Sequence, residues 1–553
     1  MSGRKKTAVG ILAMLLLFVG MTGLSAESIT LKIRESDTIP IPGIQDNDVA
    51  NAIEKKLGIK IDYSVWDKAK DQVALASGDL PDIMQIETVD LPTYINGGNI
   101  ISLEDLIKTK GKDILANSAK SVAFSRQYAS AGKNTLYGIY TGIDVNAVNT
   151  PAYNYAIGLS LRWDYYKELG YPAINNEDDY LKVLAAMQKK HPKTDDGLRV
   201  YGISGWADWG LWAYYVPYVF SNGSMNGSNY TTVDLKGNVT PMFTDKGGVF
   251  KNAMKFLNKA NALGLVDPEM FTMKNDQWQA KFKNLQLLSN PANWWNGDVV
   301  KAMTAAGIKD AGYYIVPGSM PMQWQGYGSA LAGNTPTRIL VISKTCKNPD
   351  KAMELINYLF TFEGARLAHS GVQDVHWSLV NGKPEIKDET FAASKSDAEF
   401  NRKSGIGIYN NMIGLGYNSR AKSGNFLGLS NTDKAIKMGV SEGDKDFNAK
   451  YGVDYPGQAF VKLAEKKKIS IGYFDLTYQN LYEEKSSDLK LIDGKINDYS
   501  MSFAAKLALA KPADFESVWT TGVKEMKAMG LDTLYAWELA QNKKALAQLA
   551  SLK

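Results

Sequence analysis

The chain has 553 residues, of which 45% are hydrophobic and 22% are charged, and its formal net charge is +5. This composition is typical of a globular protein and excludes low-complexity, collagen-like and highly charged disordered chains. The length predicts two to four domains or two large interlaced lobes.

The first 26 residues are predicted to be a secretory signal peptide. Basic residues 4–6 precede an apolar run over 8–20, which is shorter than the roughly 20 residues that span a bilayer. Small residues around Ser25 and Ala26 favour cleavage there. The alternative is an uncleaved N-terminal anchor. The next residue is Glu27 and not a cysteine, so we expect no lipid anchor and a protein that is free in the periplasm.

The net charge bears on the expected partners, and the single cysteine bears on disulfide bonding. Removal of the three leader cations lowers the net charge from +5 to about +2, so nucleic acid is not an expected partner. The basic run Glu465–Lys468 is expected to be a solvated helix face. Cys346 is the only cysteine, which excludes an intrachain disulfide. We expect it to be a partly buried filler.

The mature N-terminus predicts alternating strands and helices. Strands are expected at 29–35, 59–66 and 81–87, and helices at 48–58 and 67–79. The order β-α-β-α-β predicts a parallel sheet with helices on its faces. Ligands of such sheets meet the loops beyond the carboxyl ends of the strands, so Arg34 and Glu87 become candidate ligand contacts. Glu87 has the alternative role of capping the following turn.

After a short strand at Asn134–Gly142 the pattern becomes mainly helical. Strand-like segments return at Gly312–Gly318 and Thr337–Ser343, and a helical tail ends the chain. A sheet that stops and resumes indicates two lobes joined by several crossings. The predicted divisions are a signal peptide (1–26), an N-terminal lobe (27–147 and 312–377) and a C-terminal lobe (148–311 and 378–553).

Six segments, taken in order, resemble the family 1 extracellular solute-binding proteins of carbohydrate ABC importers. They are 74–84 (ALASGDLPDIM), 96–107, 134–139, 161–187, 348–377 and 515–538. The chain is most similar to the long oligosaccharide-binding subgroup. The resemblance implies an α/β periplasmic-binding-protein fold with two interlaced lobes, the C-terminal one rich in helices. It also implies a monomer without cofactors that closes on an oligosaccharide and delivers it to the permease subunits of an ABC importer.

The chain departs from that family in two places. Glu27 replaces the lipid-bearing cysteine of many relatives, which favours a periplasmic protein. Some relatives carry a calcium loop after the helix that ends here at Lys190. Asp195, Asp196 and Gly197 remain, but the alternating oxygen ligands are missing, so we expect no metal.

Aromatic residues are the leading candidates for a sugar site, because a sugar ring presents C–H groups on its face and hydroxyls on its edge. The stretch GWADWGLWAYY places Trp206, Trp209 and Trp212 three residues apart, and glycines interrupt it. Core packing is the alternative for each of these residues. Further candidates, with the same alternative, are Asn293, Trp294, Trp295, Trp324, Tyr327, His376 and Trp377. An ion pair at a helix start is favoured for Arg162 and Asp164.

A secreted glycoside hydrolase or lyase is the competing hypothesis, since 58 acidic residues leave carboxylate pairs open. The G-x-S-x-G, H-E-x-x-H and phosphate-loop motifs are absent, and each of the three histidines is expected to be structural. A surface adhesin would need an anchor that the sequence does not show. We therefore predict a binding protein without catalytic residues.

Overall fold

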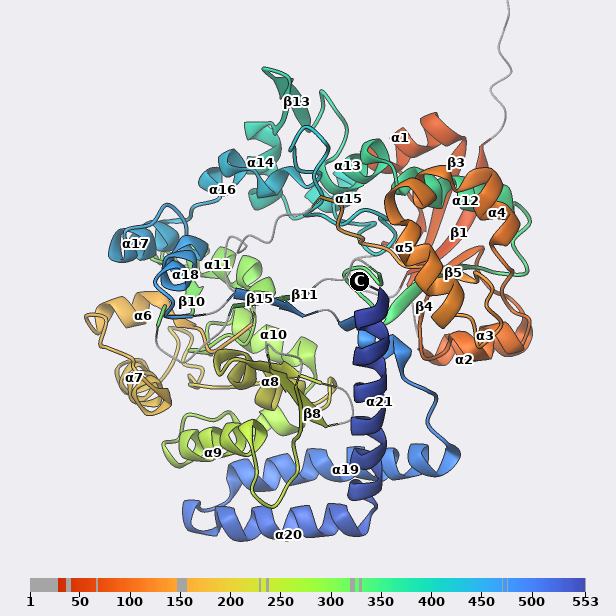
Figure 1. The fold of residues 1–553 in the computed structure, drawn as a ribbon. Coiled ribbons are helices and arrows are strands. Elements are labelled where there is room, and N and C mark those ends of the chain that lie inside the picture. The colour runs from red at the N-terminus through yellow and green to blue at the C-terminus, as the bar shows by residue number, and fades with distance from the viewer. Residues whose placement is uncertain are drawn as a thin grey trace, which may run out of the picture.

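Two hydrophobic cores organise the molecule. The computed structural model describes residues 28–35, 41–65, 68–146, 157–227, 230–234, 238–318, 324–327, 331–469, 471–474 and 476–552. One core lies in a mixed β-sheet with its helices, and the other lies in a mainly helical body beside it (Figure 1). This arrangement confirms the predicted α/β fold of two interlaced lobes. The predicted signal peptide lies outside the described residues.

A six-stranded sheet with the order β2-β3-β1-β4-β12-β5 forms the first body. Its strands are β1 (Ile29–Glu35), β2 (Gly43–Ile44), β3 (Ile59–Val65), β4 (Ile83–Glu87), β5 (Gly138–Ile139) and β12 (Arg338–Ile342). β1 runs parallel to β3 and β4, as the alternating pattern predicts. β12 is antiparallel to both of its neighbours and enters the sheet after the chain has passed through the second body. The strand predicted at 134–142 contributes only the two residues of β5 to this sheet.

Helices pack around this sheet. They are α1 (Asp48–Leu57), α2 (Lys68–Ser77), α3 (Leu91–Asn96), α4 (Glu104–Lys110), α5 (Lys112–Tyr128), α12 (Pro349–Leu359) and α13 (Phe362–Ser370). In α1, the side chain of Asn47 accepts a hydrogen bond from the backbone N–H of Ala50 at the first turn. Gly58 ends the helix in the left-handed conformation, with φ 65°. The sequence therefore predicted both ends of α1 within one residue.

The second body is mainly helical, with two small antiparallel sheets. Its helices are α6 (Trp163–Glu168), α7 (Glu177–Lys190), α8 (Trp212–Ser221), α9 (Val249–Ala262), α10 (Asn275–Lys283), α11 (Asn296–Ala305), α19 (Ser487–Leu509) and α20 (Phe515–Ala528). Its strands are β6 (Leu161–Arg162), β7 (Ser224–Asn226), β8 (Thr231–Asp234), β9 (Val239–Pro241) and β10 (Tyr313–Tyr314). β10 pairs with β6 and packs in this core, although the sequence analysis assigned 312–318 to the first lobe. The expected ion pair at the start of α6 is present, with Arg162 Nε 2.9 Å from Asp164 Oδ1.

A smaller layer lies along the top of Figure 1 and continues down its left side, beside the second body. It contains β13 (Trp377–Val380), β14 (Lys383–Ile386), α14 (Asp388–Ser396), α15 (Phe400–Ser404), α16 (Asp433–Met438), α17 (Glu442–Tyr451) and α18 (Pro456–Glu465). Trp377, Ile386 and Phe391 form a small core of their own. Phe447 of α17 packs into the second body, so this layer leads the chain back to that body.

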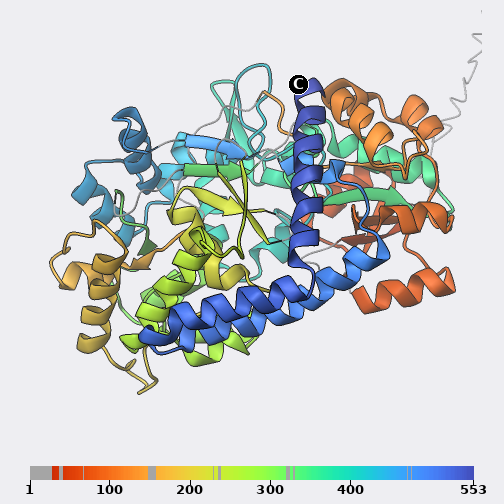
Figure 2. The same cartoon turned by 60° about the horizontal axis from the view of Figure 1, so that its bottom comes forward.

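Two features join the bodies. β11 (Trp324–Tyr327) pairs in parallel with β15 (Ile471–Phe474), and the short 3-10 helix η4 (Leu476–Leu481) follows. The last helix, α21 (Leu531–Leu552), rises between the bodies in both views (Figures 1 and 2). Leu531 and Tyr535 of this helix pack in the second core, whereas Ala545 and Leu549 pack in the first. A single helix therefore belongs to both cores.

The remaining expectations concern membrane-spanning helices and the boundaries of the lobes. Among the helices of the described ranges, none combines the length and hydrophobicity that a membrane span requires. The lobe boundaries stay predictions, because the connecting residues 147–156 and 319–323 lie outside the described residues.

Candidate ligand-binding site

Six tryptophans from three separate segments meet on the second body. We call them the tryptophan cluster: Trp206, Trp209, Trp212, Trp278, Trp294 and Trp295. They come from the loop that leads into α8, from α10, and from the 3-10 turn η2 (Asn293–Trp295) before α11. Each ring lies within 6 Å of at least one other, as the 4.7 Å between the ring centres of Trp206 and Trp278 illustrates. Three segments far apart in sequence thus build one aromatic surface.

The cluster has a buried layer and an outer layer. Trp206 and Trp278 are fully buried, with 0% of their surface exposed. Trp209 and Trp294 are 47% and 50% exposed, and Trp212 and Trp295 are half-buried. We call the four outer residues the platform. Large aromatic side chains are rarely left this exposed in a soluble protein unless something covers them.

Trp206 supports the platform from beneath. Its ring centre lies 5.2 Å from that of Trp209, 5.7 Å from that of Trp212 and 4.9 Å from that of Trp295. Of the three tryptophans in GWADWGLWAYY, Trp206 is therefore a supporting residue, and the side chains of Trp209 and Trp212 reach the surface.

Glycines and backbone hydrogen bonds fix the loop that carries the platform. A Cβ atom at Gly205 would lie 3.0 Å from Cβ of Ala213, so this residue lets the loop pass close to α8. Gly210 adopts φ +62°, which turns the chain into the helix. The carboxylate of Asp208 accepts a hydrogen bond of 3.0 Å from the backbone N–H of Asn275 at the start of α10. The loop is thereby tied to the segment that supplies Trp278.

Amide side chains lie in the same segments as the tryptophan cluster. Asn290 donates to Asn296 at 2.6 Å, and Gln279 donates to Asn275 at 2.6 Å. Within the described part of the chain, Nδ2 of Asn275 is buried and has no hydrogen-bond partner. Asn293, a predicted contact, is half-buried in η2. Such planar groups can donate to and accept from hydroxyls at the edge of a sugar ring.

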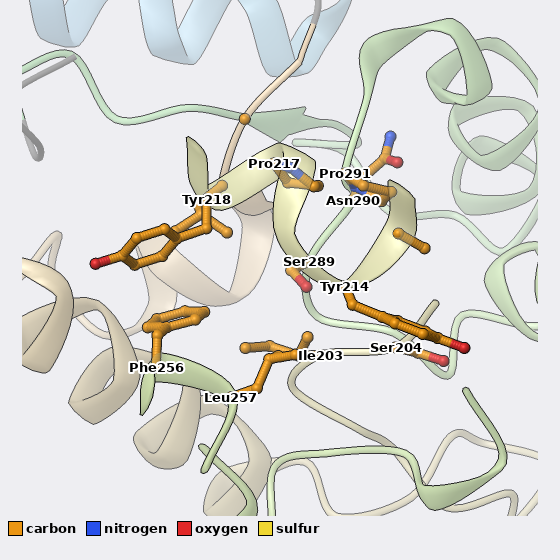
Figure 3. A pocket seen from close by; sticks show the side chains of 13 residues that line it. Ile203, Ser204, Tyr214, Pro217, Tyr218, Phe256, Leu257, Ser289, Asn290 and Pro291 are labelled. Atoms are coloured by element: carbon orange, nitrogen blue, oxygen red, sulfur yellow. The ribbon is translucent and has the colours of Figure 1, made fainter. Parts of the chain in front are cut away.

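A cavity of about 30 Å³ lies next to α8, but it is too small for a sugar. Figure 3 shows its lining, which includes Tyr214 and Tyr218 of α8, Phe256 of α9, and Ser289 and Asn290. The hydroxyl of Tyr218 donates to Glu177 at 2.6 Å. A space of this size holds about one water molecule. The cavity is therefore part of the packing behind the platform.

Candidates on the first body lie at the carboxyl ends of its strands. Arg34 is 5% exposed, and Glu87 is half-buried opposite Arg338 of β12. The neighbouring Glu35, which the sequence analysis did not single out, is 1% exposed. Burial raises the pKa of its carboxyl to about 7, against the opposing effect of hydrogen bonds from Tyr63 and Asn411.

His376 and Trp377 have structural contacts in this structure. His376 accepts a hydrogen bond of 3.0 Å from the backbone N–H of Val372, and Trp377 donates one of 2.8 Å to the carbonyl of Gly371. Each is 7% exposed, so we remove both from the proposed ligand contacts. Trp324 and Tyr327 lie in β11, and their side chains are outside the described part of the structure.

Metal ligands are a separate question. Within the described ranges, no group of three or more histidine, cysteine, aspartate or glutamate side chains is arranged to hold a metal ion. The absence of a metal stays a prediction.

Comparisons with known proteins were made for sequence and for structure. A sequence profile described as bacterial extracellular solute-binding protein matches residues 44–366, more than half of the chain. Among curated proteins, no sequence matches.

Solved structures of similar fold cover nearly the whole chain. An EF-hand mutant of FusA, an ABC-transporter substrate-binding protein of S. pneumoniae in complex with fructo-nystose, is 18% identical with a TM-score of 0.62, over 94% of this chain and 100% of that one. The alginate-binding protein AlgQ2 without calcium ion is 18% identical with a TM-score of 0.58, over 94% and 99%. A human-milk-oligosaccharide (HMO) binding protein of an ABC transporter from Bifidobacterium longum infantis is 13% identical with a TM-score of 0.60, over 93% and 98%. At these identities the likeness shows the fold.

Proposed function

Because the chain belongs to the bacterial extracellular solute-binding protein family, we propose that it captures an oligosaccharide outside the cytoplasm and delivers it to the permease subunits of an ABC importer. The observation that carries this proposal is the tryptophan platform. Its four outer rings offer flat apolar surface on the second body, and buried tryptophans hold that surface in place.

The chemistry of the platform suits a carbohydrate. Sugar C–H faces stack on indole rings, and the half-buried amides of Asn275 and Asn293 can bond the hydroxyls at the ring edge. Aromatic anchors of this kind typically contribute 1–3 kcal/mol each to binding, about 5- to 150-fold in affinity. Four platform residues can therefore provide most of the affinity for a short oligosaccharide.

The fold neighbours support the same class of ligand. FusA was solved with fructo-nystose, AlgQ2 is an alginate-binding protein, and the Bifidobacterium protein is an HMO-binding protein. These are three chemically different glycans, so the neighbours support a carbohydrate without indicating which one.

Binding without cleavage is the critical test. The protein is purified without residues 1–26 and screened by thermal shift against neutral and acidic oligosaccharides. A ligand at a hundred times its dissociation constant adds about 2.7 kcal/mol to the stability of the native state. We expect a shift for one glycan family, with the glycan recovered intact. A glycan recovered cleaved would favour the hydrolase or lyase, and no shift with any glycan would contradict the sugar assignment.

Export and location complete the proposal. The family is extracellular, and the leader with Glu27 in place of a cysteine supports a free periplasmic monomer after cleavage near Ser25 or Ala26. N-terminal sequencing of the protein recovered from the periplasm tests this directly. An N-terminus at Met1, or recovery in the membrane fraction, would contradict it.

A further inference from the structure

We infer that the platform selects uncharged oligosaccharides and discriminates against chains of uronic acids. This inference rests on the proposed function, and it specifies the class of sugar that the same site takes. The charged residues in the segments that carry the tryptophan cluster support it.

The segments that carry the cluster contain no arginine. They are residues 204–212, 274–283 and 289–298. A guanidinium group is the side chain that best matches a carboxylate, because its planar fork donates two parallel hydrogen bonds. A site built for a uronic acid would be expected to place such a group beside the ring that it stacks.

Two of the three lysines in these segments are already held in ion pairs. Nζ of Lys281 lies 2.8 Å from the carboxylate of Asp267, which is fully buried. Nζ of Lys283 lies 2.9 Å from the carboxylate of Asp298. The third, Lys274, lies next in sequence to Asn275 and near Asp276. Lys281 and Lys283 are thus balanced by neighbouring acids.

Two acidic residues neighbour the platform tryptophans in sequence. Asp208 is exposed and precedes Trp209 directly in sequence. Asp298 is 60% exposed and follows Trp295 by three residues, so it lies on nearly the same side of α11. Lys301 follows Trp295 by six residues and is displaced by roughly 120° around the helix axis. A carboxylate on a bound sugar would therefore have to compete with Asp298 for Lys283, and Asp208 beside Trp209 adds a further negative charge.

The two arginines at the described strand ends of the first body lie in the sheet. Arg34 is buried and directs a guanidinium nitrogen to the sulfur of Met84 at 3.5 Å, and Arg338 lies opposite Glu87 in the sheet.

The test compares two tetrasaccharides that differ only at C6. The probes are β-1,4-mannotetraose and the corresponding tetramannuronate, supplemented by the neutral tetrasaccharides cellotetraose, maltotetraose and nystose. Dissociation constants are measured by calorimetry with the full mature chain. We expect at least one neutral tetrasaccharide to bind, and tetramannuronate to bind at least tenfold more weakly than the best neutral chain.

A charge variant sharpens the comparison. Asp298→Asn removes a rim carboxylate and frees Lys283 from its ion pair. It should strengthen binding of tetramannuronate severalfold and leave the neutral tetrasaccharide unchanged. The matched control is Asp488→Asn, at an acidic residue in the first turn of α19, which should alter neither.

The possible outcomes distinguish a failure of this inference from a failure of the proposed function. A tetramannuronate that binds as tightly as every neutral chain would overturn this inference and leave the proposed function standing. Equal effects of Asp298→Asn on charged and neutral sugars would also overturn it. If no sugar of either kind binds, the proposed function itself is wrong.

Discussion

Replacement of Trp209 by alanine separates a ligand contact from a core residue. Trp209 is 47% exposed, so about half of its ring surface is available to a ligand. A tryptophan side chain covers about 200 Å² when it is buried. If a sugar covers 80 Å² of the exposed half, the lost burial amounts to about 2 kcal/mol at 25 cal/mol per Å². The expected loss of affinity is therefore about 30-fold.

The effect on folding should be smaller than the effect of removing a buried ring. Trp209 contacts Trp206, Trp212 and Trp295 with ring centres 5.2–5.8 Å apart, so Trp209→Ala should lower the free energy of unfolding by about 1–2 kcal/mol. Trp206→Ala removes a fully buried ring and should cost about 3–5 kcal/mol. Urea unfolding measures both values.

Calorimetry with the glycan found in the screen then gives the dissociation constants. Trp209→Phe keeps an aromatic face and should lose less than Trp209→Ala. Trp537→Ala is the control, because Trp537 is also half-buried, with its ring centre 6.0 Å from that of Tyr482, but lies on α21 outside the cluster. Wild-type affinity in all three of Trp209→Ala, Trp212→Ala and Trp294→Ala would refute the platform as the binding site.

Other consequences of the structure can be tested separately. Because the folded pKa of Glu35, about 7, exceeds its usual 4.5, this group binds its proton more tightly in the folded state, and stability falls as pH rises between these values, by up to about 3 kcal/mol. Glu35→Gln should flatten the melting temperature over that pH range, and a profile parallel to wild type would contradict the assignment. Lys281→Met leaves the buried carboxylate of Asp267 without its cation and should cost about 3 kcal/mol by urea unfolding. Lys283→Met, at a pair that is 48% and 60% exposed, should cost less than about 1 kcal/mol, and equal losses would be evidence against this reading. Closure of the two bodies on a saturating ligand should lower the radius of gyration in X-ray scattering, and an unchanged value would contradict it.

Local signals predicted the elements of the first sheet well. Residues 29–35 and 59–65 alternate as strands, and α1 begins and ends at the capping residues Asn47 and Gly58. These features depend on neighbours in sequence, so a single sequence contains them. The position of β12 in the sheet depends on its pairing with β4, although the chain passes through the second body between these two strands. Local sequence patterns do not encode such a pairing.

The members of the tryptophan cluster were predicted in part as candidates. The stretch GWADWGLWAYY led to Trp206, Trp209 and Trp212, and Trp294 and Trp295 were further candidates. Trp278 was missed, because it is a single tryptophan in a polar helix segment, and only the tertiary fold brings it to the others. The three tryptophans do not lie on one helix, because α8 begins only at Trp212 and Gly210 turns the chain before it. Burial, which separates Trp206 from its neighbours, is a property of the whole fold.

The route of the chain through both bodies determines the order in which the protein can fold. β12 completes the sheet between β4 and β5, and the last turns of α21 complete the core beneath it. Neither body can therefore be finished while the chain is still being synthesised or translocated, because each waits for residues near the C-terminus. A truncation before Ala545 would leave the first core open at Leu549 and Ala545, and neither lobe can be cut out as a continuous stretch of sequence. Such a protein reaches its native state only after release of the complete chain, and during export it depends on staying soluble while both cores are open.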